Sequence, residues 1–192
     1  NSSRFGKWVE LYVNRQKIIS SANISHYLLE KSRVTHQNKD ERNYHIFYQL
    51  LAAINNKDMV NKYPSLLDNP LYKDLKSLKY LNKTYTSNDL KQFEQTINDF
   101  KSLNFPMEDI KTIFNCLIGI LKIGNLKIKA NKRDNAEIAF DDVDLIACAS
   151  LFQVSPLQLA QAITSETRTM GRKSIISVPL SLAASINTIG AL

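Results

Sequence analysis

The sequence has little cysteine: Cys116 and Cys148 are the only two among its 192 residues. Both lie in apolar segments with helical spacing. A free thiol packs as a small hydrophobic group, whereas disulfides form mainly in oxidising compartments. We therefore expect two buried free thiols and a reducing compartment. The two cysteines and three histidines also match no zinc-ligand spacing, so no zinc site is expected.

Glycine is scarce as well, with five in the whole chain. The dinucleotide-binding pattern G-x-G-x-x-G and the nucleophile elbow G-x-S-x-G are both absent. Gly119 and Gly124 have the spacing of a Walker A phosphate loop, but Asn125 and Leu126 follow where that loop needs lysine. The residues by themselves therefore contain no complete catalytic constellation.

Long apolar runs are missing too. The longest, 113–123, is interrupted by Asn115, Gly119 and Lys122, and a membrane span needs about 18 apolar residues. The polar start lacks the apolar core of a signal peptide. With 44% hydrophobic and 22% charged residues, the composition is that of an ordinary globular domain. We expect a soluble protein of one domain, two at most, with no membrane span.

The net charge of +7 favours a polyanionic partner: nucleic acid, an acidic membrane or an acidic protein filament. The lysines are scattered, however, and no basic face interleaved with aromatic residues is present. Binding to nucleic acid is therefore not expected. Charge alone does not choose between the other partners.

Hydrophobic periodicity predicts a mainly α fold with a short β hairpin at the N-terminus. The hairpin should have strands over 5–13 and 18–29 around a turn at 14–17. Residues 55–83 should form short helical pieces, 127–135 a charged loop, and 164–177 a polar, basic stretch. Helices are expected over 41–54 with N-cap candidates at 38–41, from a cap at 87–89 to about 100, from near Pro106 to Ile123, from 141–142 to 152, from 155–156 to 163, and over 180–192.

The most informative stretch is Asn1–Lys7, N-S-S-R-F-G-K. One hydroxyl of a serine pair can bind Mg²⁺ while the other bonds a phosphate or a water, and an adjacent arginine can pair with a carboxylate. Composition alone favours a polar tail that leads into a strand. The residues themselves leave both interpretations open.

This stretch resembles switch I of myosin motor domains, N-x-N-S-S-R-F-G-K, without its first two residues. Tyr27–Val34, Y-L-L-E-K-S-R-V, and Glu41–Leu51, E-R-N-Y-H-I-F-Y-Q-L-L, are similar to two further myosin motifs in the same order and spacing. Tyr80–Asn82 and Ile120–Asn125 resemble weaker ones. Kinesins also carry S-S-R in switch I, but they follow it with Ser-His and have no counterpart of residues 27–51. The resemblance to myosin covers essentially the whole chain.

The resemblance implies a fragment of the α/β P-loop NTPase motor fold that starts within switch I. Residues 1–34 would hold switch I and the following strands, and 35–192 the helical upper 50 kDa region. Ser3 would be a ligand of the Mg²⁺ bound to ATP, Ser2 would lie by the γ-phosphate and the attacking water, and Arg4 would pair with a switch II glutamate outside this chain. The amide of Asn1 is a weaker candidate for nucleotide contact.

The same resemblance implies contacts with the actin filament. Residues 164–181 correspond to the family's cardiomyopathy loop and 127–138 to its loop 4. Actin has an acidic surface, so Arg168, Arg172 and Lys173 are candidates for steering and binding. A solvated basic turn is the alternative for each of these residues.

We therefore expect part of an actin-activated ATPase of the cytoplasmic actin cytoskeleton, with ATP and Mg²⁺ as ligands. The missing initiator methionine and the uncapped last helix lead us to expect that the chain is a fragment, inactive by itself. Light chains and cargo would bind through other segments. The alternative is a non-catalytic actin-binding or scaffold module derived from a motor domain.

Overall fold

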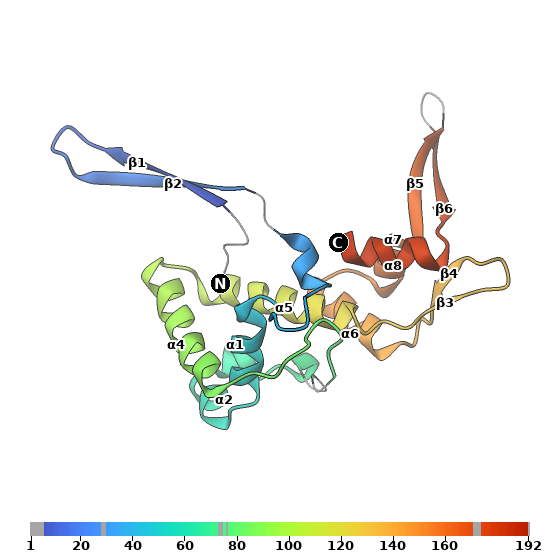
Figure 1. The fold of residues 1–192 in the computed structure, drawn as a ribbon, viewed down its shortest axis with the longest axis horizontal. Helices are drawn as coiled ribbons and strands as arrows, with labels where there is room; N and C mark the ends of the chain where they lie inside the picture. The colour runs from blue at the N-terminus through green and yellow to red at the C-terminus, as the bar shows by residue number, and fades with distance from the viewer. Residues whose placement is uncertain (1–5, 28–29, 73–74, 76, 171–173, 192) are drawn as a thin grey trace.

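The computed structural model describes residues 6–27, 30–72, 75, 77–170 and 174–191. A helical body carries antiparallel strand pairs that extend from it, as Figure 1 shows. The helices of the body are η1 (Lys31–Val34), α1 (His45–Ile54), α2 (Lys57–Lys62), α3 (Pro64–Leu67), η2 (Pro70–Tyr72), α4 (Ser87–Ser102), α5 (Met107–Ile123), α6 (Val143–Phe152), α7 (Pro156–Thr164) and α8 (Leu182–Ala191).

Three two-stranded pairs complete the described part of the chain. They are β1 (Gly6–Val13) with β2 (Ile19–Tyr27), β3 (Ile128–Ala130) with β4 (Ala136–Ile138), and β5 (Ser165–Met170) with β6 (Ser174–Pro179). The expectation of a mainly α chain with an N-terminal hairpin is confirmed. Two more hairpins are present that the periodicity did not predict.

The larger hydrophobic core lies where α1, α4 and α5 pack together with the short helices α2 and α3. Its centre is aromatic: Phe93 of α4 is fully buried, and its ring lies 5.7 Å from that of Phe114 of α5. Tyr63 packs edge-on against Phe93 at 6.3 Å. The apolar spacing in α4 correctly predicted that this helix buries one face. Helix α5 was expected to be buried nearly all round, but it buries one face and leaves residues such as Lys111 and Thr112 exposed.

A second core joins the end of α5 to α6 and α7. At Gly119 the backbone of α5 passes so close to α6 that an added Cβ would lie 2.5 Å from the Phe152 ring. The thiol of Cys148 lies 3.5 Å from the Gly119 carbonyl oxygen, which accepts its hydrogen bond. Burial raises the pKa of Cys148 to about 12, so the thiol stays protonated. The predicted free thiols are confirmed, with Cys148 buried and Cys116 half-buried.

The hairpin of β1 and β2 extends away from the helical body (Figure 1). Gly6 pairs with Tyr27 at its base, and the register continues to Val13 opposite Ile19. Large apolar side chains such as Trp8, Leu11 and Ile24 are more than half exposed. A two-stranded hairpin is only marginally stable without a packed face. The helical cores therefore supply the stability of the described chain.

Local capping signals located two helices correctly. Asp142 caps α6 by accepting from the N–H groups of Asp144 and Leu145, and Ser155 caps α7 with Pro156 in the first turn. The cap of α4 is Thr86, one residue earlier than predicted. Asp89, the third residue of that helix, completes the capping box with it.

Two local predictions were wrong. Helix α1 begins at His45 rather than Glu41, because the carboxylate of Glu41 accepts a hydrogen bond from Arg33 and does not cap the helix. The expected loop at 127–135 is instead the hairpin of β3 and β4. Asn131 closes its turn: the side-chain oxygen accepts from the N–H groups of Arg133 and Asn135.

No single helix in the described ranges is long and apolar enough to cross a membrane. The adjacent helices α6 and α7 meet the length and composition criteria only as a pair, across a bend of 105°.

Candidate functional site

The predicted switch residues Asn1, Ser2, Ser3 and Arg4 lie outside the described residues, as do Arg172 and Lys173. The structure does describe the segment that follows Arg4, from Gly6 onward. Gly6 begins β1 directly opposite Tyr27, the last residue of β2. The described chain resumes at Glu30, where it enters the helical body. The candidate site is therefore built from this end of the hairpin.

A polar cluster holds the chain at this entry point; we call Glu30, Arg33, Glu41, Asn43 and Tyr44 the exit cluster. The guanidinium of Arg33 donates to Glu30 Oε2 at 3.1 Å, to Glu41 Oε2 at 2.8 Å and to the carbonyl oxygen of Arg42 at 2.6 Å. Its side chain is only 8% exposed. Burial would lower the pKa of Arg33, but the bonds and charges of Glu30 and Glu41 outweigh burial and raise it.

The rest of the exit cluster ties the same turn to the body. The Asn43 amide donates to the carbonyl oxygens of Val34, at 2.9 Å, and Tyr80, at 2.8 Å. The Tyr44 hydroxyl donates to the Glu30 carbonyl at 2.8 Å. Charged hydrogen bonds in a buried setting are strong and directional. The exit cluster therefore fixes three separate segments, around residues 30, 43 and 80, in one arrangement.

An ion pair between Arg42 and Asp89, in which only Asp89 is buried, lies next to the exit cluster. Arg42 donates to Asp89 Oδ2 at 2.8 Å, and its guanidinium stacks 3.9 Å from the centre of the Tyr48 ring. Thr86 donates to the same carboxylate from its backbone N–H and its hydroxyl. Burial alone would raise the pKa of Asp89, but the bonds from Arg42 and Thr86 outweigh it, and the pKa lies below its usual value.

Asp89 therefore links stability to pH. The pKa of Asp89 in the folded state is below the unfolded value of about 3.9. Its contribution to the free energy of unfolding is therefore complete at pH values above about 3.9 and is lost as pH falls through the folded-state pKa. We expect Asp89→Asn to lower the free energy of unfolding at pH 7 by about 2 kcal/mol and to flatten the acid limb of the stability curve. Urea unfolding between pH 7 and pH 2 measures both effects.

Asp99→Asn is the matched control, since Asp99 lies on the same helix, is exposed and accepts a hydrogen bond only four residues away. It should change the stability at pH 7 by less than about 0.5 kcal/mol. If the free energy of unfolding of Asp89→Asn falls as steeply with decreasing pH as that of the unmodified chain, Asp89 does not link stability to pH.

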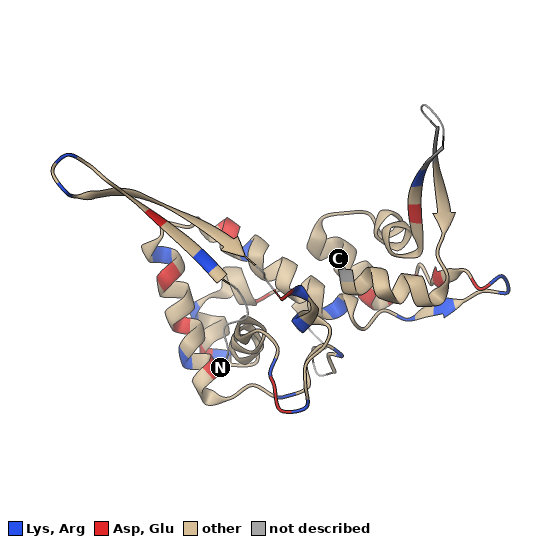
Figure 2. Cartoon of the chain, turned by 45° about the horizontal axis from the view of Figure 1, so that its top comes forward, with Lys and Arg blue, Asp and Glu red and all other residues tan. Residues whose placement is uncertain are grey.

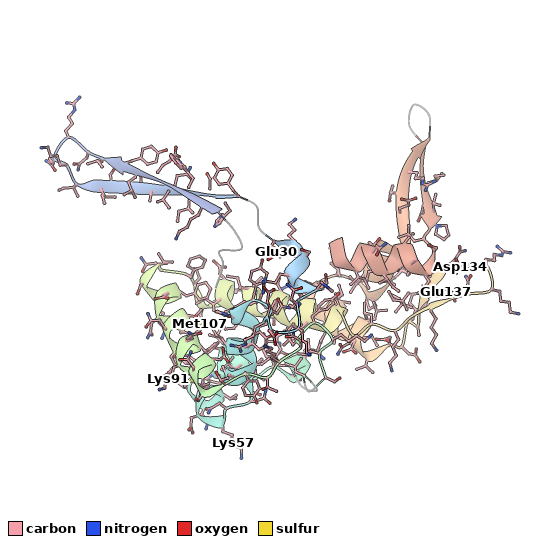
Figure 3. The ribbon with its side chains drawn as sticks, viewed as in Figure 1. Glu30, Lys57, Lys91, Met107, Asp134 and Glu137 are labelled. Carbon is pink, nitrogen blue, oxygen red and sulfur yellow. The ribbon has the colours of Figure 1, made fainter. Side chains whose placement is uncertain are left out.

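The two predicted actin-facing segments form hairpins at the other end of the molecule (Figures 1 and 2). Arg168, on β5, is exposed and forms an ion pair with Glu166 two residues earlier. Basic residues gather in the β3–β4 loop, which includes Lys132 and Arg133, and Figure 3 labels Asp134 and Glu137 beside them. The surface here is of mixed charge, because acidic residues such as Asp134 and Glu137 lie close to the basic ones.

A groove of about 850 Å³ lies at the same end, between β4, α6 and α7. Of its acidic residues, Asp142 caps α6 and Asp144 pairs with Lys122 at 3.6 Å. No nucleophile with an adjacent base lines it. Within the described ranges there is also no cluster of three or more His, Cys, Asp or Glu residues that could hold a metal ion.

Reasoning from the sequence missed the role of the exit cluster. Its members lie inside the two segments that carry the family resemblance, 27–34 and 41–51. Glu30 and Arg33 are three residues apart, but the other partners are 8 to 37 residues away. An arginine with two glutamates within ten positions was the available signal in the sequence. That pattern alone does not distinguish a buried cluster from a solvated face.

The family model of the myosin head (motor domain) matches residues 1–192, which is the whole chain. The chain is 37% identical to Myosin-1 of Saccharomyces cerevisiae over 153 residues, 79% of this chain. It is 36% identical to human unconventional myosin-XV over 196 residues, 97% of this chain. It is 38% identical to the Myosin-I heavy chain of Dictyostelium discoideum over 168 residues, 85% of this chain.

The aligned regions are a small part of these relatives: 8% of the yeast protein, 5% of the human protein and 7% of the Dictyostelium protein. The match to the family model nevertheless extends from the first residue of this chain to the last. The mainly helical body with short antiparallel strand pairs agrees with that match. The chain belongs to the myosin head (motor domain) family.

Proposed function

We propose that this chain is part of an actin-based motor that couples hydrolysis of Mg-ATP to movement along actin filaments. The observation that carries the proposal is the match of the family model to all 192 residues, including N-S-S-R-F-G-K at Asn1–Lys7. In this proposal residues 1–34 are the switch I segment with its following strands. Residues 35–192 are the helical part of the upper 50 kDa region of the motor.

The proposed roles follow from the chemistry of the side chains. Mg²⁺ prefers oxygen ligands and retains waters and phosphate oxygens around one or two protein groups, so the single hydroxyl of Ser3 suits it. Bound Mg²⁺ would neutralise charge on the phosphates. Ser2 would orient the attacking water by the γ-phosphate, and Asn1 would bond the nucleotide. Arg4 would close the site by pairing with a carboxylate of switch II.

Residues around the β3–β4 and β5–β6 hairpins are proposed to contact actin. Arg168, Arg172 and Lys173 would add positive charge that attracts the acidic filament, an effect that acts mainly on the association rate. The location would be the actin cytoskeleton of the cytoplasm. Light chains and cargo would bind other parts of the motor.

A steady-state ATPase assay tests the proposal. We expect a complete motor domain that carries this chain to hydrolyse Mg-ATP, and to do so faster as actin is added. The isolated 192-residue chain should show no single-turnover hydrolysis, because it contains no phosphate-binding Walker A loop. Actin binding without hydrolysis by the motor domain would instead indicate a scaffold module, and hydrolysis by the isolated chain would refute its proposed dependence on other segments.

A further inference from the structure

The groove between β4, α6 and α7 is lined partly by apolar side chains that belong to neither core. Ile138 and Ala160 form part of its buried lining and are members of the second core. Its exposed lining includes Phe140, Val143 and Leu157, whose exposed fractions are 65%, 78% and 51%. A large apolar side chain that is exposed singly is ordinary, but several that line one groove are typical of an interaction site. The groove therefore has the composition of a docking surface.

Helix geometry keeps these side chains out of the core. Val143 is the first residue of α6, and the fully buried Leu145 lies about 200° around the helix from it. On α7 the exposed Leu157 precedes the buried Leu159 by two residues in the same way. Ile146, about one turn after Val143, is also exposed, so the apolar strip continues along α6. Because each helix already turns its opposite side to the core, burial of this strip needs a partner outside the described body.

An added strand is a poor fit to this groove. The strand β4 has three residues, and the Ala136 N–H already donates to the Leu180 carbonyl oxygen at 2.8 Å. Recognition of an extended peptide depends on a free row of backbone N–H and carbonyl groups, whereas a helix docks through its side chains. The apolar strip on α6 and α7 therefore suits an amphipathic helix.

The charges of the groove favour a basic occupant. Its charged lining consists of four acidic residues and two lysines: Glu137, Asp141, Asp142, Asp144, Lys127 and Lys129. Asp144 pairs with Lys122 at 3.6 Å, while the exposed side chain of Asp141 makes no ion pair or hydrogen bond within the described ranges. This excess of carboxylates is local, because the net charge of the chain is +7. Charge complementarity therefore favours lysine or arginine on the partner.

We infer that this groove binds a short amphipathic helix of a partner protein. The apolar stripe of that helix covers Phe140, Val143 and Leu157, and basic residues beside the stripe pair with the carboxylates at 141–144. The acidic filament proposed for the nearby hairpins does not fit here, because like charges would meet at 141–144. The inference goes beyond the proposed motor function and does not depend on it, since neither nucleotide nor filament takes part.

A synthetic peptide and a complete motor domain that carries this chain test the inference, without ATP or actin. The probe is a fluorescein-labelled helix of about 18 residues, made of Leu, Lys and Ala, with leucines at i, i+3, i+4 and i+7. We expect fluorescence anisotropy to show binding with a Kd of about 100 µM or tighter at about 0.15 M salt. A peptide with glutamate for every lysine, and one of the same composition in shuffled order, should bind at least about tenfold more weakly. Equal binding of either peptide overturns the inference.

Two double variants locate the binding site. Phe140→Ala with Val143→Ala should weaken binding of the basic peptide about tenfold, because the apolar stripe loses both contacts. Leu103→Ala with Met107→Ala is the matched control: it also removes one exposed apolar side chain from a helix start and one from the turn before it. Figure 3 labels Met107 and Glu137 at different ends of the body. The control should bind as tightly as the unmodified protein, and equal weakening in both double variants refutes the assignment.

Asp141→Asn tests the charge of the occupant. It should weaken binding of the basic peptide about threefold at about 0.15 M salt, and the difference should disappear at about 1 M salt, where screening is stronger. Asp134→Asn is the control, since it removes the same charge from the exposed β3–β4 turn outside the groove lining. It should change the Kd by less than about 1.5-fold. If Asp141→Asn binds the peptide as tightly as the unmodified protein at low salt, the occupant is not basic.

Other occupants of the groove would appear in separate measurements. If the unmodified motor domain sediments as a dimer and Phe140→Ala with Val143→Ala as a monomer, a second copy fills the groove. If this double variant lowers Tm by about 5 °C or more, another segment of the motor covers the groove. Binding of the unmodified protein to anionic vesicles, lost in the same variant, assigns the groove to a membrane surface. Each of these results, or no binding of the basic peptide, contradicts the inference.

Discussion

In a complete motor domain that carries this chain, Arg4→Glu is expected to slow single-turnover ATP hydrolysis by roughly 100-fold or more. Arg4 is proposed to close the site by pairing with a switch II carboxylate, and glutamate would replace this attraction with repulsion between like charges. ATP affinity should change by less than about threefold, because phosphate binding depends mainly on the Walker A loop. Quench-flow hydrolysis and binding of a fluorescent ATP analogue measure the two effects separately.

Arg15→Glu is the control for this prediction. It makes the same charge reversal in the exposed turn between β1 and β2, at the opposite end of the same hairpin. Hydrolysis by this variant should match that of the unmodified motor. Normal hydrolysis by Arg4→Glu would show that the switch assignment is wrong, and equal slowing by both variants would indicate a general effect of charge on the hairpin.

Elements whose signals are local could be predicted from the sequence. Ser155 and Pro156 start α7 through contacts within four residues, and Asp142 does the same for α6. The apolar face of α4 could also be predicted, because helical spacing places residues such as Phe93 and Ile97 on one side of the helix.

Elements whose signals are not local were predicted wrongly or incompletely from the sequence. Glu41 looked like a helix-start residue, but its carboxylate is taken by Arg33, so α1 begins four residues later. The β3–β4 hairpin was missed because its strands have three residues each, too short for an alternating pattern to be visible.

The candidate site shows the same difference between residues that could be predicted from a local motif and residues that could not. Asn1–Arg4 could be assigned because a family resemblance supplies roles for consecutive residues, and those assignments remain predictions. The exit cluster follows the hairpin directly, yet it could not be predicted, since Asn43 meets Tyr80 only after the body has folded. A buried polar cluster is specified by three-dimensional packing rather than by spacing.

The stability of the helical body should depend most strongly on its aromatic centre. Phe93→Ala is expected to lower the free energy of unfolding by about 3–5 kcal/mol, because it deletes a fully buried ring and leaves a cavity between α4 and α5. Tyr63 and Phe114 both contact this ring, at centroid distances of 6.3 and 5.7 Å, and cannot both move to fill the space. Urea unfolding of the 192-residue chain, followed by circular dichroism, measures the change.

Leu103→Ala is the control, because Leu103 follows the same helix α4 and is 70% exposed. It should change the free energy of unfolding by less than about 0.5 kcal/mol. Phe93→Leu keeps most of the buried volume and should fall between the two. If Phe93→Ala cost no more than Leu103→Ala, the packing of α4 on α5 would not be what stabilises the helical body.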